Sequence, residues 1–472
     1  MNKNIRTHNL GFPRIGAKRE LKRALETFWA GQTSEAQLLE TAKAIRAENW
    51  RTQRAAGIDL IPSNDFSFYD QMLDTSALLG AVPERFHWSG NNVDLKTYFA
   101  MARGVSKTSD CGTCGSNHAT TALEMTKWFD TNYHYLVPEL SAGQTFQLSS
   151  TKPFDEFAEA QALGIKTVPV IIGPLTFLLL AKSRGKNFDR LSLLPKLLPV
   201  YAEILHRLKS QGAEWVQLDE PALCLDLTPE QRAAFESAYK EIRQSAPELK
   251  LLLATYFGNL RDNLKTAVQL PVDAIHFDAV RAPHELERLL AELPKDKHLS
   301  LGVVDGRNIW RNDFENSLKL LRQAAKAIGD ERLLVSPSCS LLHSPVSLKH
   351  ETKLDAELKS WLAFAEEKLS EVGLLAKLVN QSGDSAALLE NRKAIASRRN
   401  SPRIHNSVVK SRAKAVSPTD LKRQNVFSVR RAKQQNRLNL PAFPTTTIGS
   451  FPQTEDVRVA RAKFKKGELS SA

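Results

Sequence analysis

Residues 215–221 read WVQLDEP, a short apolar run that ends in two acids and a proline. The same order recurs through the middle of the chain: an apolar run, then polar residues, then a longer amphipathic segment. Strand-length runs separated by helical patterns predict βα units and a parallel sheet. We expect strands at residues 58–61, 167–172, 215–218, 251–255, 274–277, 299–304 and 333–335.

The number of these units favours a closed barrel. We expect an eighth strand, with a weaker pattern, around residues 146–148. Eight βα units predict an α/β fold of the (β/α)8 TIM barrel class. A doubly wound sheet is the alternative, but no G-x-G-x-x-G motif follows a strand, which disfavours its nucleotide-binding form.

Other segments lie outside this repeating pattern. Residues 1–56 are expected to form a helical N-terminal extension, with helices at 18–29 and 34–56, and residues 57–375 the barrel. Residues 376–439 lack an apolar period and are expected to form a connector. The strand-like run PAFPTTTIGS at 441–450 predicts that residues 440–472 form the first element of a second barrel.

The positive charge of the chain is concentrated in the connector. Residues 391–437 contain fourteen Lys or Arg and a single acid, Asp420, so this stretch accounts for the whole net charge of +13. A basic stretch can bind RNA, but this one has only one aromatic residue, Phe427, and no recognisable nucleic-acid module. We therefore expect no specific nucleic-acid partner, and only weak binding of polyanions.

Composition and patterning also restrict the class of protein. The N-terminus has no apolar signal region. The longest apolar run, 168–181, contains Gly173 and Pro174 and is shorter than a membrane span of about 18–20 residues. We therefore expect no membrane-spanning segment and no membrane partner. Four cysteines give no disulfide framework, so we expect a cytoplasmic protein.

Polar residues gather directly after the expected strands. In a barrel these strand ends meet at one face, where active sites are built. Acids in such positions can instead cap the following helix. Asp219 and Glu220 form a carboxylate pair that can serve as acid and base, but in the family that the later motifs resemble, the copy of Asp-Glu-Pro that contacts a substrate lies in a second barrel, so that resemblance implies a structural role for this pair. The set comprises Asn64, Asp65, Pro174, Asp219, Glu220, Pro221, Tyr256, Asp278, Asp305, Ser338 and Cys339.

Several longer motifs occur in a characteristic order: LGFPRIGAKRELKRALETFWAG, EMTKWFDTNYHYLVPE, QLDEPAL, DGRNIWR, SCSLLHSP and FPTTTIGSFPQT. Together they closely resemble cobalamin-independent methionine synthases over residues 10–467. That resemblance implies two (β/α)8 barrels joined by a long connector. It also implies methyl transfer from 5-methyltetrahydropteroyltriglutamate to L-homocysteine, which gives L-methionine.

The same resemblance explains why the chain repeats its opening motif. A glycine followed by Phe-Pro stands at residues 11–13 and again within residues 449–452. The resemblance implies that TIGSFPQT begins the second barrel and that the chain is truncated early in it. The family needs no cobalamin but uses zinc, held in the second barrel by a His-x-Cys pair, a Glu and a later Cys. No His-x-Cys occurs in this sequence, so we expect no metal ligands and no activity of the chain alone.

The resemblance also assigns binding residues. Polyglutamate carboxylates are met by Arg and Lys through charge-assisted hydrogen bonds, although the same cations can simply form the solvated face of an amphipathic helix. For folate it implies the RELK residues and the lysine of EMTKW: Arg19, Glu20, Leu21, Lys22 and Lys127. For the amino-acid part of homocysteine or methionine it implies Ile448, Gly449 and Ser450.

Two stretches that contain cysteine carry incomplete signatures of a metal site. Cys111, Cys114 and His118 form half of a zinc or redox signature, with no second cluster at usable spacing, so we expect a polar loop with reactive thiols. Cys339 matches the position of the family's late zinc ligand in the duplicated barrel, and we expect a packed vestige.

Two alternatives to an inactive folate-side barrel remain open. One is a separate chain that supplies the second, C-terminal barrel. The other is a non-catalytic remnant that only binds polyglutamylated folate.

Overall fold

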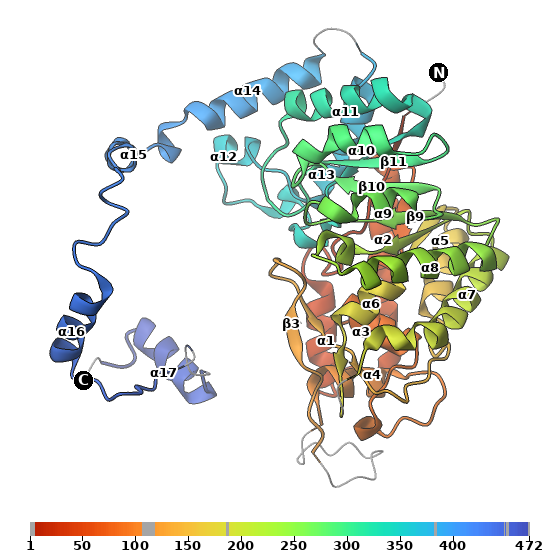
Figure 1. The fold of residues 1–472 in the computed structure, drawn as a ribbon, viewed down its shortest axis with the longest axis horizontal. Helices are drawn as coiled ribbons and strands as arrows, with labels where there is room; N and C mark the ends of the chain where they lie inside the picture. Colours follow the sequence, from red (N-terminus) through yellow and green to blue (C-terminus); the bar gives the residue numbers. More distant parts are fainter. Residues whose placement is uncertain are drawn as a thin grey trace. The chain divides into compact units, whose positions relative to one another are not determined.

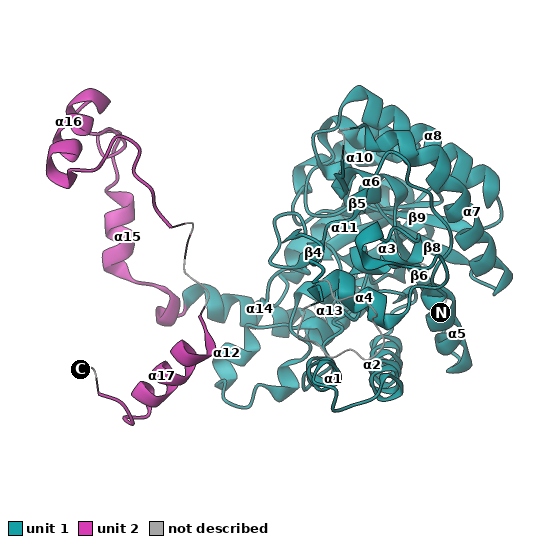
Figure 2. Ribbon diagram, turned by 90° about the horizontal axis from the view of Figure 1, so that it is seen from below, with its two compact units in different colours: residues 1–400 teal, residues 401–472 magenta. Residues whose placement is uncertain are grey.

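The computed structural model describes residues 5–105, 119–185, 188–381, 385–447, 449 and 453–470. The chain divides into two compact units, residues 1–400 and residues 401–472 (Figure 2). No helix within the described residues is both long and apolar enough to cross a membrane.

The first unit is built on one sheet of eight parallel strands. Hydrogen bonds from Asn9 N to Leu60 O and from Leu60 N to Thr7 O join the two edge strands, and His8 and Leu60 form a parallel bridge. The sheet therefore closes on itself, which confirms the predicted (β/α)8 barrel. In spatial order the strands are β1 (Arg6–Thr7), β12 (Leu333–Pro337), β11 (His298–Val304), β10 (Ala274–Asp278), β9 (Lys250–Ala254), β8 (Trp215–Asp219), β6 (Thr167–Ile172) and β2 (Ile61–Ser63).

The location of one strand differs from the sequence prediction. The expected strand at residues 146–148 is wrong, because those residues form no strand. The remaining strand is β1, which lies in the N-terminal segment where we expected only helices. Its neighbourhood is buried but polar, with Thr7, His8 and Asn9 each at most 2% exposed. A polar strand carries no apolar run, so the pattern could not reveal it.

Helices surround the barrel on its outside (Figure 1). They bury one apolar face against the strands, and the leucine-rich strands β9 and β11 are covered on both sides, as parallel sheets require. The main helices of this layer are α5 (Lys152–Ala162), α6 (Pro174–Leu180), α7 (Leu194–Ser210), α8 (Pro229–Ser245), α9 (Leu264–Gln269), α10 (Leu286–Glu292), α11 (Phe314–Ile328) and α13 (Ala365–Leu378), and α14 (Ala386–Asn400) packs on α11.

A second apolar cluster lies beside the barrel core. It joins α1 (Glu20–Trp29), α2 (Glu35–Ala55), α3 (Gln71–Leu78), α4 (Leu95–Arg103) and a hairpin of β3 (Met125–Lys127) and β4 (His134–Leu136). Leu21, Leu38, Phe99 and Leu136 are all buried in it. Ser34 begins α2 with a capping box to Gln37, as the sequence SEAQ favours.

The second unit consists of short helices. These are α15 (Ser407–Lys414), α16 (Phe427–Leu438) and α17 (Glu455–Lys465), and none has a buried residue. The strand-like run from residue 440 forms no strand in its described part. A lone strand has no neighbour to satisfy its backbone groups, which accounts for the difference. The boundaries expected at residues 375 and 439 stay predictions.

Candidate functional site

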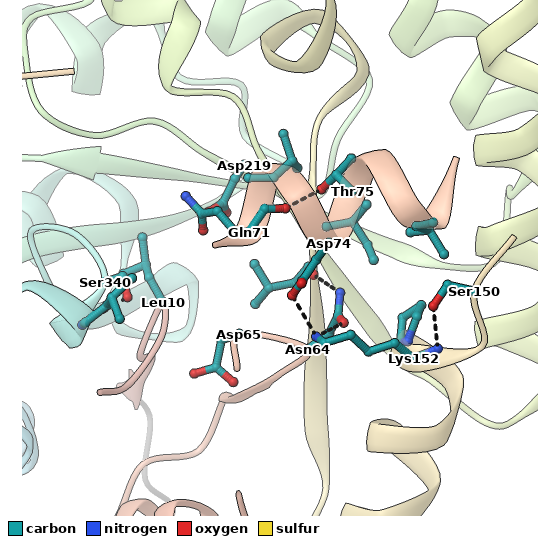
Figure 3. Close-up of a pocket in the computed structure, with 16 residues that line it drawn as sticks. Leu10, Asn64, Asp65, Gln71, Asp74, Thr75, Ser150, Lys152, Asp219 and Ser340 are labelled. Carbon is teal, nitrogen blue, oxygen red and sulfur yellow. Dashed lines mark hydrogen bonds and ion pairs between the residues drawn. The ribbon is translucent and has the colours of Figure 1, made fainter. Parts of the chain in front are cut away.

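The carboxyl-terminal ends of the strands, here called the barrel mouth, enclose a small cavity of about 30 Å³. A cavity of this size has room for roughly two water molecules. Its lining includes Asn64, Asp65 and Asp74 from the segment that follows β2, Lys152 from the start of α5 and Asp219 from the end of β8 (Figure 3). The prediction that polar residues after the strands converge is therefore confirmed for Asn64, Asp65 and Asp219.

Lys152 is the central cation of this cavity. Its Nζ donates to Asn64 Oδ1 at 2.7 Å and lies 3.3 Å from Asp74 Oδ2 (Figure 3). Glu156 Oε1 also lies 3.3 Å from this Nζ. Arg46 Nη1 lies 3.7 Å from the same Glu156 oxygen. Burial alone would lower the pKa of Lys152, but the Glu156 and Asp74 carboxylates outweigh it and the pKa is raised. The ammonium is therefore held charged.

The carboxyl groups of Asp65 and Asp219, which line the cavity, are much less acidic than usual. Burial raises the pKa of Asp65 to about 7, although Phe12 N donates to its Oδ2 at 2.8 Å. Burial likewise raises the pKa of Asp219 to about 7. Groups that titrate near neutrality are the kind that can exchange protons at a functional site.

Asp219 belongs to a hydrogen-bond network inside the barrel. It accepts from Gln217 Nε2 at 2.6 Å and from Tyr256 OH at 2.8 Å. Gln217 Oε1 lies 2.9 Å from His8 Nε2, and Ser300 Oγ lies 2.8 Å from His8 Nδ1. We assign the His8 proton to Nε2, because the amide oxygen can only accept. Burial lowers the pKa of His8 to about 3, so the ring is neutral.

The neighbouring Glu220 accepts hydrogen bonds from the start of a helix. Its carboxylate accepts from Leu175 N at 3.2 Å, from Thr176 N at 2.7 Å and from Tyr239 OH at 3.2 Å. The first two donors belong to the first turn of α6. Both acids of the Asp-Glu-Pro motif are thus committed to internal hydrogen bonds, which agrees with the structural role expected for them.

The tip of the β3–β4 hairpin lies against loops of the mouth. The Phe129 and Phe257 ring centroids are 5.6 Å apart, and those of Tyr133 and His343 are 5.9 Å apart. Burial lowers the pKa of His343 to about 4, so this ring is also neutral. The mouth is therefore partly covered by a segment of the same chain.

The residues expected to bind folate lie at the start of α1 and on the hairpin. Arg19 and Lys22 are exposed, and Lys127 is exposed on β3. Glu20 accepts from Lys18 N at 2.9 Å. Leu21 is fully buried, and its main-chain N–H donates to Ile15 O at 3.2 Å. These folate-binding assignments stay predictions.

The start of α1 and the hairpin pack on the same core. Leu21 and Leu136 belong to one apolar cluster, and Leu136 pairs with Met125 across the hairpin. The two segments that carry the separately predicted cations thus pack on one apolar cluster.

The other predicted sites are less fully described. Gly449 is an exposed bend, while Ile448 and Ser450 lie outside the described residues. Cys111, Cys114 and His118 also lie outside them.

Zinc does not fit the described part of the chain. No three His, Cys, Asp or Glu side chains there are grouped to hold a metal ion. Cys339 is fully buried, and its sulfur has Ser340 O at 3.6 Å and Ser338 Oγ at 4.0 Å as its neighbours. Burial raises the pKa of this thiol, which opposes the thiolate form that a metal requires.

Sequence reasoning missed two charged residues of this region. Lys152 stands four residues before Glu156, so the pair could have been found from helical spacing. Arg307 occurs in the DGRNIWR motif, but its contact with Asp130 joins residues 177 positions apart. No local pattern reports such a contact.

Comparison with known proteins gives a family and a fold. Residues 6–329 match the family model "Cobalamin-independent synthase, N-terminal domain", and residues 443–472 match "Cobalamin-independent synthase, Catalytic domain". The chain is 54% identical over 98% of its length to a protein of Rhodopseudomonas palustris, and 52% identical over 98% to one of Caulobacter vibrioides. Both are named 5-methyltetrahydropteroyltriglutamate–homocysteine methyltransferase.

The match does not extend over the whole of those relatives. The chain spans 60% of the first protein and 61% of the second. Among solved structures, a putative vitamin-B12 independent methionine synthase of Listeria monocytogenes aligns with a TM-score of 0.54 at 15% identity, over 80% of this chain and 99% of that one. One from Shewanella sp. W3-18-1, in complex with selenomethionine, aligns with a TM-score of 0.52 at 15% identity, over 80% and 96%. At this identity the two structures support the fold alone.

Proposed function

This chain belongs to the cobalamin-independent methionine synthase family, and we propose that it supplies the folate side of a methyl transfer. The reaction moves the methyl group of 5-methyltetrahydropteroyltriglutamate to L-homocysteine and gives L-methionine. The family models and the names of the relatives support this proposal. We also propose a cytoplasmic location, supported by the free thiols of Cys224 and Cys339.

One structural observation favours folate binding by this unit. Arg19 and Lys127 are exposed cations whose side chains have no hydrogen-bond or ion-pair partner within the described ranges. Lys22 has only an exposed contact, 3.7 Å from Glu26. All three belong to segments that pack on one apolar cluster. Uncommitted cations on segments that share one cluster suit a ligand tail that carries several carboxylates.

The methyl transfer also needs chemistry that the described residues do not supply. Bound zinc would hold the homocysteine sulfur as a thiolate. The residues described here do not fit that role, as Cys339 illustrates, so the present chain is assigned binding and orientation of the folate only. Ile448, Gly449 and Ser450 are proposed to contact the amino-acid part of homocysteine once a second barrel surrounds them.

Two variants of this proposal differ in what completes the site. In the first, a separate protein supplies the C-terminal barrel and the two halves assemble. In the second, the chain binds polyglutamylated folate and takes part in no reaction. The match of residues 443–472 to the catalytic-domain model supports a role of this segment as part of a second barrel.

A binding titration tests the proposal directly. The purified chain is titrated with 5-methyltetrahydropteroyltriglutamate and with the monoglutamate. We expect tighter binding of the triglutamate, and a loss of that preference in Arg19→Ala and Lys127→Ala. Lys166→Ala is the matched control. Lys166 is exposed, pairs with Glu214 and directly precedes the first residue of β6, at the end of the strand opposite the barrel mouth. Equal binding of both folates by the unaltered chain would contradict the proposal.

A turnover assay separates the two variants. Methionine formation is measured for the chain alone, and again after addition of a separately produced catalytic barrel and zinc. Assembly predicts turnover only in the mixture. No turnover in either, together with a retained preference for the triglutamate, favours the binding role.

A further inference from the structure

Lys127 is carried by a hairpin with little support of its own. β3 and β4 pair over only three residues each, with Lys127 opposite His134. Every residue of β3 is exposed. An isolated two-stranded hairpin is marginally stable in water. The position of Lys127 must therefore depend on contacts made elsewhere on the hairpin.

The aromatic contacts of the tip supply part of that support. Phe257, which follows β9, lies 5.6 Å from Phe129 and 5.5 Å from His343 between ring centroids. Tyr133 completes the group with its edge-to-face contact to His343. These contacts are apolar and broad, so they limit how far the tip moves but fix its position less closely than a directed bond would.

Arg307 adds a directed contact to the same tip. Its Nη1 donates to Asp130 Oδ1 at 2.7 Å, and its Nη2 donates to Asp130 O at 3.0 Å. The guanidinium also lies over the Phe257 ring, 5.0 Å from its centroid. The Arg307 side chain is only 12% exposed. The Arg307 guanidinium thus binds both the side chain and the main chain of Asp130 at the tip. The Phe257 ring beneath it restricts the movement of the guanidinium.

We propose that Arg307 is a positioning residue for folate, acting through Asp130 to hold Lys127 in place. This inference rests on the proposed function, since it takes Lys127 as a ligand of the glutamate tail. Lys127 stands three residues before Asp130 and ends the strand that leads into the tip. Fixing the tip therefore fixes the backbone from which the lysine extends. A lysine ordered before binding loses less entropy when it meets a carboxylate.

The inference predicts a specific pattern of binding. Releasing the tip should weaken the triglutamate, whose tail reaches Lys127, and should leave the monoglutamate unchanged. A general loss of structure would weaken both folates equally. The ratio of the two dissociation constants therefore separates positioning from a merely structural role.

Asp130→Ala is the first test variant, because Asp130 is 68% exposed and its side chain leaves no cavity. Arg307→Met is the second. Arg307→Lys is expected to keep part of the effect, because lysine keeps the charge but lacks the planar pair of nitrogens that meets both Asp130 oxygens. We expect the triglutamate dissociation constant to rise about three- to tenfold in Asp130→Ala, with the monoglutamate unaffected. Asp226→Ala is the matched control, because it breaks another exposed pair, with Arg261 at 2.7 Å.

Limited proteolysis gives a readout that needs no ligand. Trypsin cleaves after lysine, and the Lys127–Trp128 bond lies at the base of the tip, with Trp128 buried. We expect faster cleavage at this bond in Asp130→Ala and Arg307→Met than in the unaltered chain or in Asp226→Ala.

The outcomes distinguish the two proposals. If Lys127→Ala weakens triglutamate binding but Asp130→Ala and Arg307→Met do not, the positioning role is overturned and folate binding stands. If neither Lys127→Ala nor Arg19→Ala affects the triglutamate, the proposed folate site fails, and the positioning role fails with it. Weaker triglutamate binding and faster cleavage in both tip variants would support the inference.

Discussion

Replacing Lys152 by Met should destabilise the first unit strongly. The change keeps most of the side-chain volume but removes the charge at the centre of the mouth cavity. Asp74 and Glu156 would lose a cation 3.3 Å away, and Asn64 Oδ1 would lose a donor at 2.7 Å. The Lys152 side chain is 22% exposed and that of Glu156 is 4% exposed, so water replaces the lost partner only in part.

The magnitude follows from two estimates. Removing one partner of a buried ion pair costs about 3–5 kcal/mol. Glu156 can escape an unpaired charge by taking up a proton. At pH 7 this costs at most about 3.4 kcal/mol, the value for a carboxyl group with the usual pKa of 4.5, because burial already raises the pKa of Glu156. Arg46 remains 3.7 Å from Glu156 and reduces the loss of unfolding free energy. We therefore expect a loss of about 3 kcal/mol in the free energy of unfolding at pH 7.

The same reasoning predicts how the loss depends on pH. Proton uptake by Glu156 becomes cheaper as the pH falls towards 4.5, so the effect should shrink to about 1 kcal/mol at pH 5. Urea unfolding can be followed by tryptophan fluorescence, because all seven tryptophans lie within residues 29–361 and report the first unit alone. Lys166→Met is the control, as its pair with Glu214 is exposed, and it should change stability by less than about 1 kcal/mol. A loss for Lys152→Met that is below 1 kcal/mol at pH 7, or equal at pH 5 and pH 7, would refute the reasoning.

Three further predictions concern buried groups. Leu21→Ala should cost about 2–5 kcal/mol in unfolding free energy, because Leu21 is fully buried in the cluster that holds the hairpin; urea unfolding measures it. Cys224 and Cys339 should resist a thiol reagent until the chain unfolds, since both are buried and burial raises the pKa of each thiol; counting modified thiols with and without urea checks this. Burial raises the folded pKa of Asp219 from 3.8 to about 7, so its contribution to stability is complete below pH 4 and is lost as pH rises through 7. Asp219→Asn should therefore gain stability relative to the unaltered chain between pH 4 and pH 8 in urea titrations, and a constant difference would contradict this.

The sequence predicted those parts of the fold that carry an apolar signal. Seven strands coincide with apolar runs, and Ser34 marks the start of α2 because its side chain and that of Gln37 cap each other. β1 was missed for the opposite reason. The residues around it fill the barrel with hydrogen-bonded polar groups, as His8 does with Gln217 and Ser300, so burial there leaves no hydrophobic trace.

The sequence predicted only those parts of the site that follow from single motifs and their order along the chain. The convergence of Asn64, Asp65 and Asp219 follows from barrel topology, once each is known to follow a strand. The Arg307–Asp130 contact and the shared cluster of Leu21 and Leu136 depend on which loops meet in space. Such contacts are set by loop conformations that a single sequence does not encode in its periodicity.

The glycine that opens each copy of the repeated motif shows what a barrel adds to it. A Cβ at Gly11 would collide with the Ser340 side chain, and Asp65 Cβ stands 3.6 Å from the same point. Glycine is therefore required there because residues from two other βα units pack against it. Within the described residues, a Cβ added at Gly449 would meet no atom within 4 Å. The packing found around Gly11 is therefore missing around Gly449 in the described part of the chain. This agrees with our proposal that residues 448–450 contact homocysteine only once a second barrel surrounds them.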